Sequence, residues 1–134
     1  MNALDDTNII LDTDSYKASH FLQYPPAMTR MMSYLESRGG TYPATRFFGL
    51  QYVIKRYLST AVTLEMVEEA AALLGAHGEP FPLEAWRTIA TDLSGKLPLE
   101  IRAVPEGTLV PTHNALMTVT NTDERFPWLV SWFE

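Results

Sequence analysis

Three segments in the middle of the chain carry apolar residues at the three- and four-residue spacing of amphipathic helices. The first is predicted to follow Gly49, and its apolar positions are Leu50, Val53, Ile54, Tyr57 and Leu58. The second is predicted to begin after an N-cap at Thr63 and to stop at Gly75. The third is predicted to begin near Pro82 and to end at Gly95. Each stripe predicts one buried helix face, which we interpret as core rather than as a cofactor site.

Alternation of apolar and polar residues predicts β-strands in the remaining segments. We expect strands over residues 31–38, 97–104, 108–111 and 115–120. Gly39-Gly40 ends the first strand, and turn-forming residues separate the later ones. Strands and helices that occur in separate blocks predict the α+β class, with a mixed or antiparallel sheet flanked by helices.

The last segment predicts a helix from about residue 124, capped by Asn121-Thr122-Asp123 and lacking a stop signal. Its apolar residues are Phe126, Trp128, Leu129, Trp132 and Phe133. Because the pattern does not terminate, we expect residues 1–134 to form a single domain that belongs to a longer chain. We also expect this helix to expose aromatic surface and to promote self-association.

Composition narrows the possible functions. Hydrophobic residues make up 46% of the chain, which suffices for a core. The net charge of −6 argues against a nucleic-acid partner, because contacts with phosphates need a basic surface. The lack of cysteine excludes disulfides and thiolate metal sites. The acidic start, residues 1–6, does not resemble a signal peptide, and no apolar run reaches the ~20 residues of a membrane span. We therefore expect a cytoplasmic protein that does not bind membranes.

The closest grouping of polar side chains that could bind a ligand lies near the start of the chain. The apolar residues Ile9–Leu11 precede a polar run that contains Asp14, Tyr16 and Lys17. Burial of these apolar residues would anchor the turn that follows them, so that its polar side chains project at a defined place. The alternative is a plain helix start, with Asp14 as the N-cap and with Tyr16 and His20 on one face.

A second alternative for this stretch is the D-x-D motif of the haloacid-dehalogenase phosphotransferases. In that motif an apolar strand precedes two aspartates, here Asp12 and Asp14, with Mg²⁺ between them. Tyr16 stands where that family has threonine or valine, and no β-α-β alternation follows. The chain has no glycine-rich phosphate loop of standard spacing and no G-x-S-x-G element. Three histidines are too dispersed to predict a metal site: His20, His77 and His113.

A series of short segments resembles the N-terminal region of the nicotinamide phosphoribosyltransferases, which are type II phosphoribosyltransferases. In family order, the segments are Thr13–Lys17 with His20, Gln23–Pro26, Ser33–Arg38, Phe48–Tyr52, Leu97–Ile101, Ala103–Gly107, Asn121–Asp123 and Trp128–Leu129. They cover nearly the whole chain. The chain departs from the family between Arg38 and Arg46, where it is shorter than the vertebrate members.

The resemblance implies an enzyme of NAD salvage that makes nicotinamide mononucleotide and pyrophosphate from nicotinamide and phosphoribosyl pyrophosphate. It implies a head-to-tail homodimer, whose active sites lie at the mouths of α/β barrels and are completed by the N-terminal domain of the other subunit. Mg²⁺ would accompany phosphoribosyl pyrophosphate, and this chain would bind no cofactor. The barrel is not among these 134 residues, so none of them is expected to be catalytic.

The resemblance also assigns substrate-binding residues. Tyr16 would stack on the nicotinamide ring of the neighbouring subunit with Asp14 beside it, and its hydroxyl would be incidental. Arg38 would bind the ribose 5-phosphate in trans, because a guanidinium matches phosphate oxygens. Lys17 could add positive field. A different class stays open at this point: a standalone, non-catalytic interaction domain whose apolar C-terminal segment docks a partner.

Overall fold

A computed structural model describes residues 8–134, so the acidic start over residues 1–6 lies outside the described residues. The elements in chain order are η1 (Ile9–Leu11), η2 (Ser15–Gln23), β1 (Met32–Glu36), β2 (Ala44–Arg46), α1 (Leu50–Val53), η3 (Ile54–Leu58), α2 (Leu64–Ala76), α3 (Leu83–Asp92), β3 (Leu99–Ala103), β4 (Leu109–Pro111), β5 (Ala115–Asn121) and α4 (Leu129–Phe133). Here η1 and η2 are 3-10 helices, and η3 is a π-helical continuation of α1.

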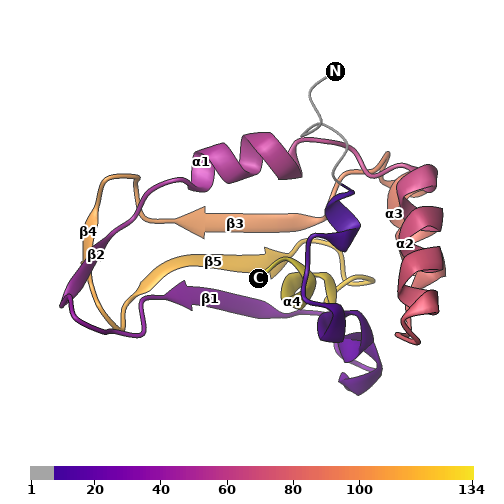
Figure 1. The fold of residues 1–134 in the computed structure, drawn as a ribbon, viewed down its shortest axis with the longest axis horizontal. Helices are drawn as coiled ribbons and strands as arrows, with labels where there is room; N and C mark the ends of the chain where they lie inside the picture. Colours follow the sequence, from indigo (N-terminus) through magenta and orange to yellow (C-terminus); the bar gives the residue numbers. More distant parts are fainter. Residues whose placement is uncertain (1–7) are drawn as a thin grey trace.

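The strands form two antiparallel sheets, which confirms the α+β prediction. The larger sheet has the order β1-β5-β3, and β2 pairs with β4 in a smaller one (Figure 1). The helices α2 and α3 lie together beyond one end of the larger sheet, and the β2–β4 pair lies at the other end. Among residues 8–134, β2 is the strand that the sequence did not predict. It has three residues, and its partner follows more than sixty positions later.

The two faces of the larger sheet differ in chemistry. Directly opposed residues in antiparallel strands share a face. One face therefore carries Ile101 opposite Val119, whereas the other carries Tyr34 and Arg102 on either side of Thr118. The helical segment α1–η3 runs along the β3 edge, where Ile54 and Leu58 line a groove of about 270 Å³ with Leu97, Leu99 and Ile101.

The α1–η3 segment is less buried than the sequence predicted. Val53 is 43% exposed, and no residue of α1 or η3 is fully buried. Periodicity identifies the residues that share a face, but it does not identify what covers them. In the described part of the chain this segment packs along the edge of the sheet and closes only one side of the groove.

The predictions for α2 and α3 are confirmed, with one shifted end. Thr63 caps α2, and its Oγ1 accepts a hydrogen bond from the Met66 N–H at 3.2 Å. Gly75 does not stop this helix, which continues to Ala76. The chain turns only at Gly78, where φ is +76°. After α3 the chain reverses at Gly95, where φ is +73° and where a Cβ would collide with the backbone of Val62.

The prediction for the last helix is wrong in its start and in its exposure. The helix α4 begins at Leu129 rather than near residue 124, because Pro127 lacks an N–H and disfavours helical geometry at the residue before it. Trp128 and Trp132 are only 8% and 2% exposed. The aromatic residues of this segment therefore pack inside the domain, which removes the reason to expect self-association.

The main core lies where α2, α3 and α4 meet the N-terminal turn. Its fully buried residues include Ile10, Val67, Trp86, Ile89, Phe126 and Leu129. A second and smaller cluster, made of Phe47, Val110 and Leu116, lies near the β2–β4 pair. Among residues 8–134, no helix is both long enough and apolar enough to span a membrane.

Candidate functional site

The N-terminal turn is anchored as the sequence predicted. Ile9 and Ile10 are buried in η1. The Asn8 side chain donates to the Met66 carbonyl at 2.7 Å and to Glu69 Oε2 at 3.0 Å, and it accepts a hydrogen bond from the Ile10 N–H at 3.1 Å. These bonds tie the turn to α2, so the residues that follow it start from a fixed point.

The same turn is also bonded to α4. Thr13 Oγ1 donates to the Trp132 carbonyl at 2.8 Å, and the Trp132 indole N–H donates to the Ile10 carbonyl at 2.9 Å. The apolar C-terminal segment is thus a structural partner of the candidate site. This burial weighs against the interaction-domain alternative, which needed that segment to be available to a partner.

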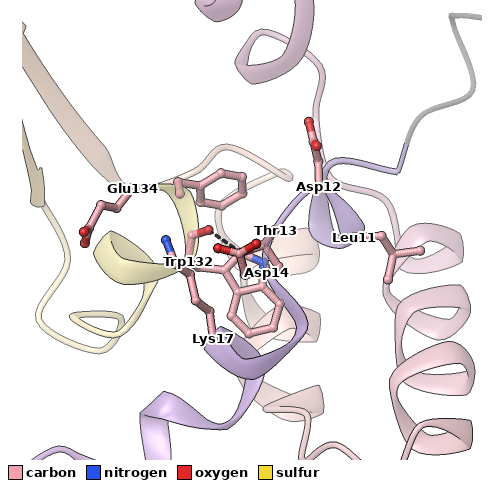
Figure 2. A pocket seen from close by; sticks show the side chains of 8 residues that line it. Leu11, Asp12, Thr13, Asp14, Lys17, Trp132 and Glu134 are labelled. Atoms are coloured by element: carbon pink, nitrogen blue, oxygen red, sulfur yellow. Dashed lines mark hydrogen bonds between the residues drawn. The ribbon is translucent and has the colours of Figure 1, made fainter. Parts of the chain in front are cut away.

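The structure also argues against the D-x-D interpretation. Residues Ile9–Leu11 form a 3-10 turn rather than a strand. Figure 2 shows that the carboxylates of Asp12 and Asp14 do not point toward one another. Two aspartates in this arrangement do not converge on one metal ion, and no group of three or more histidine, aspartate or glutamate side chains in residues 8–134 could hold one.

Asp14 and Tyr16 are brought together by the start of η2. Asp14 occupies the N-cap position with extended backbone, but its side chain caps no backbone N–H. Instead, the Tyr16 hydroxyl donates to Asp14 Oδ2 at 3.2 Å. This hydrogen bond, followed by the charge of Asp14, raises the pKa of Tyr16. The plain helix-start interpretation is therefore right about the backbone and wrong about the aspartate side chain.

Tyr16 is 55% exposed, and η2 as a whole contacts α4. The ring of Tyr16 contacts that of His20, with 5.4 Å between their centroids and an angle of 55° between their planes. His20 Nδ1 lies 3.4 Å from Ser131 Oγ, and Tyr24 donates to the same oxygen at 2.9 Å. The four-residue spacing predicted the shared face of Tyr16 and His20, but no sequence pattern indicated Ser131, which lies 111 residues beyond His20.

A hollow of about 460 Å³ opens between the N-terminal turn and α4 (Figure 2). Its lining residues are Leu11, Asp12, Thr13, Asp14, Lys17, Trp132, Phe133 and Glu134. The Lys17 side chain extends toward α4 and lines this hollow together with Asp14 and Glu134. The expectation that Lys17 adds positive electrostatic potential to the site stays a prediction.

Arg38 lies elsewhere. It is exposed and follows the end of β1 by two residues, whereas η2 and α4 lie where β1 begins. Among residues 8–134, Arg38 makes no side-chain hydrogen bond or ion pair. Gly39 and Gly40 follow it with φ of +95° and +137°. One chain therefore brings Asp14 and Tyr16 together but places Arg38 at the opposite end of the sheet.

His113 contacts the loop that carries Arg38. Its N–H donates to the Ser37 carbonyl at 2.9 Å, and its own φ is +63°. A Cβ on Gly39 would lie 3.4 Å from His113 Nε2, so the imidazole packs directly against the loop. The sequence predicted His113 as a turn residue, which is confirmed, but it gave no sign of this contact.

Comparison with known proteins points to one family. The family described as "Nicotinamide phosphoribosyltransferase, N-terminal domain" matches residues 8–101. Along its whole length the chain is 53% identical to a nicotinamide phosphoribosyltransferase of Xanthomonas campestris pv. campestris (strain 8004), of which it covers 28%. Along 90% of its length it is 30% identical to a nicotinamide phosphoribosyltransferase of Acinetobacter baylyi, of which it covers 27%. The chain thus spans less than a third of the length of these relatives.

Proposed function

Since the chain belongs to the family of nicotinamide phosphoribosyltransferase N-terminal domains, we propose that it is part of an enzyme that makes nicotinamide mononucleotide. The enzyme transfers ribose 5-phosphate from phosphoribosyl pyrophosphate to nicotinamide, releases pyrophosphate and acts in NAD salvage in the cytoplasm. The match of the family to residues 8–101 carries this proposal.

The geometry of Tyr16 supports a role in holding the base. The departure of pyrophosphate leaves an oxocarbenium-like carbon, so the attacking nitrogen of nicotinamide must be held in line with it. The Tyr16 ring is held at its hydroxyl by Asp14 and on one side by His20, while more than half of the side chain is exposed. An aromatic ring held in this way supports a flat heterocycle.

Arg38 is proposed to bind the ribose 5-phosphate. It is an exposed guanidinium without a partner in residues 8–134, on a loop where two glycines allow an anion to approach the backbone. We assign Mg²⁺ to the pyrophosphate of the substrate and propose no metal ligand in this chain.

We further propose a homodimer in which this domain completes the active site of the other subunit. The exposed aromatic and aliphatic residues support such a contact, because exposed apolar surface of this extent commonly marks an interface. They gather on β1, the β2–β4 region and α1, and they include Met32, Tyr34, Tyr42, Phe48, Tyr52 and Leu109.

Mixed dimers test the proposal. Subunits of the complete protein that carry Tyr16→Ala are combined with subunits whose barrel is inactivated. If Tyr16 acts in trans, one site of the mixed dimer carries both defects and the other carries neither. Mixing should then restore up to about half of the activity per dimer. If mixed dimers form and their activity does not rise above that of the Tyr16→Ala parent, the trans role of Tyr16 is wrong.

The chain by itself supplies a second test. The 134-residue protein alone should produce no nicotinamide mononucleotide, because the proposed phosphoribosyl pyrophosphate site lies mostly in a barrel outside these residues. Steady product formation by this chain alone would contradict the proposal.

A further inference from the structure

The Tyr16 side chain is unusually well fixed for an exposed aromatic residue. Exposed side chains ordinarily change rotamer within picoseconds to nanoseconds. The Tyr16 hydroxyl, however, is bonded to Asp14, and one side of its ring meets the ring of His20. The bond to Asp14 and the contact with His20 therefore both restrict rotation of the Tyr16 ring.

His20 is itself held by the buried part of the molecule. Ser131 is a buried residue of α4, and its Oγ lies 3.4 Å from His20 Nδ1. Tyr24 donates a hydrogen bond to the same oxygen at 2.9 Å. Ser131 Oγ therefore contacts both the Tyr24 hydroxyl and the His20 imidazole, which fixes the place of His20 against α4.

The helix that carries both rings has an unusual form. η2 keeps 3-10 geometry for nine residues, whereas runs longer than three or four are uncommon. Three hydrogen bonds connect η2 and the residues that flank it to α4. They run from Thr13 to the Trp132 carbonyl, from Tyr24 to Ser131, and from His20 to Ser131. These bonds fix η2 against α4, while more than half of the Tyr16 side chain stays exposed.

We propose that His20 is a positioning residue, which fixes the Tyr16 ring through a contact anchored to Ser131. The inference rests on the proposed function, because the purpose of a fixed Tyr16 ring is to stack on nicotinamide. A ring ordered before the base arrives lowers the entropic cost of binding and keeps the reacting nitrogen in line. In this proposal His20 acts through Tyr16, whose ring it contacts, and not on a substrate directly.

The test compares His20→Ala with two further variants in the complete enzyme. His20→Ala should lower kcat/KM for nicotinamide by roughly three- to tenfold, which is the range of an aromatic contact. The KM for phosphoribosyl pyrophosphate should stay unchanged, and the melting temperature should fall only slightly, because one of the three bonds between η2 and α4 is lost. His20→Phe retains a flat ring and should recover part of the loss. Leu22→Ala, in an exposed residue of the same helix, is the matched control and should behave as the unaltered enzyme.

A double-mutant cycle with Tyr16→Ala separates positioning from other effects. His20→Ala should cause no further loss once Tyr16 is alanine, because residues that act through one contact are not additive. Additive losses, or an equal effect on both substrates, would overturn the role of His20 while leaving Tyr16 in the site. If Tyr16→Ala alone leaves nicotinamide use unchanged, the proposed function of the site fails, and the two failures are thus distinguishable.

Discussion

The two ends of the larger sheet are held together in different ways. Where β1 begins, the rings of Trp86, Trp128 and Trp132 pack edge to face, with centroids 5.3 to 5.6 Å apart. Where β1 ends, the smaller cluster has three buried residues, and Phe48 beside it is 82% exposed. One end is a closed core, whereas the other leaves apolar surface uncovered.

The candidate site residues divide between these ends. Tyr16 belongs to the closed end, where contacts within the chain fix its position. Arg38 belongs to the open end, where residues 8–134 offer it no partner. Under the proposed function, the chain therefore fixes Tyr16, the proposed base-stacking residue, in advance, whereas Arg38 would become ordered only when it meets the phosphate. Substitutions at the two ends should therefore fail in different ways.

The largest expected effect is on stability at the closed end. Trp132→Ala removes a ring that is 2% exposed, together with its hydrogen bond to the Ile10 carbonyl. Large-to-small changes of this kind cost about 3–5 kcal/mol. Chemical denaturation of the complete protein should show this loss. Thr41→Ala at the open end is the control, and its exposed loop position predicts a change within about 0.5 kcal/mol. Equal losses would erase the distinction between the ends.

The next effect in size concerns Arg38. Arg38→Ala should remove a charge-assisted contact with phosphate, which is worth about 2 kcal/mol or roughly a 30-fold increase in the KM for phosphoribosyl pyrophosphate. Steady-state kinetics measure this effect, and the melting temperature should not change. Arg38→Lys keeps the charge without the planar fork and should recover only part of the affinity. An unchanged KM in Arg38→Ala would remove this residue from the site.

A smaller effect is expected at Tyr16. Tyr16→Ala should weaken nicotinamide binding by roughly a few-fold to tenfold, with a further loss in rate from poorer alignment. The resemblance treats the hydroxyl as incidental, but in the structure it donates a hydrogen bond to Asp14. Tyr16→Phe should therefore show a measurable loss of about twofold, smaller than that of the alanine variant. A fall in melting temperature without a kinetic change would instead make Tyr16 a structural residue.

The sequence predicted those parts of the fold in which local pattern and environment agree. The stripes of α2 and α3 and the alternation of β3 and β5 identify elements that bury one face. The prediction failed for β2, whose partner strand is distant in sequence. It also failed for the start of α4, because the aromatic spacing runs across Pro127, whereas the helix begins only after it. Which distant strands pair, and which element covers the apolar face of a helix, depend on the fold of the whole chain and not on a local pattern.

The same limit applies to the site. The family resemblance supplied Asp14, Tyr16 and Arg38, and the four-residue spacing indicated the contact between Tyr16 and His20. The anchor at Ser131 belongs to a helix more than a hundred residues later, so no local pattern could indicate it. The separation of Tyr16 from Arg38 along β1 likewise became visible only in the folded chain.

The last prediction asks whether the two ends serve one active site, and its expected result is no change. Both residues are proposed to act in trans on the same site, so a dimer of one Tyr16→Ala subunit and one Arg38→Ala subunit has a defect in each site. Such mixed dimers should show the mean of the activities of the two parent variants and no more. If Tyr16 instead acts in trans and Arg38 in cis, one site receives both intact residues, and mixing restores activity. Dimers of Tyr16→Ala subunits with barrel-inactivated subunits, which should recover activity, show that exchange has occurred. The length of β1, roughly 15 Å at about 3.3 Å per residue, is a distance that two long side chains and an extended substrate can span together. Restored activity would therefore place the two ends of the sheet in different active sites of the dimer.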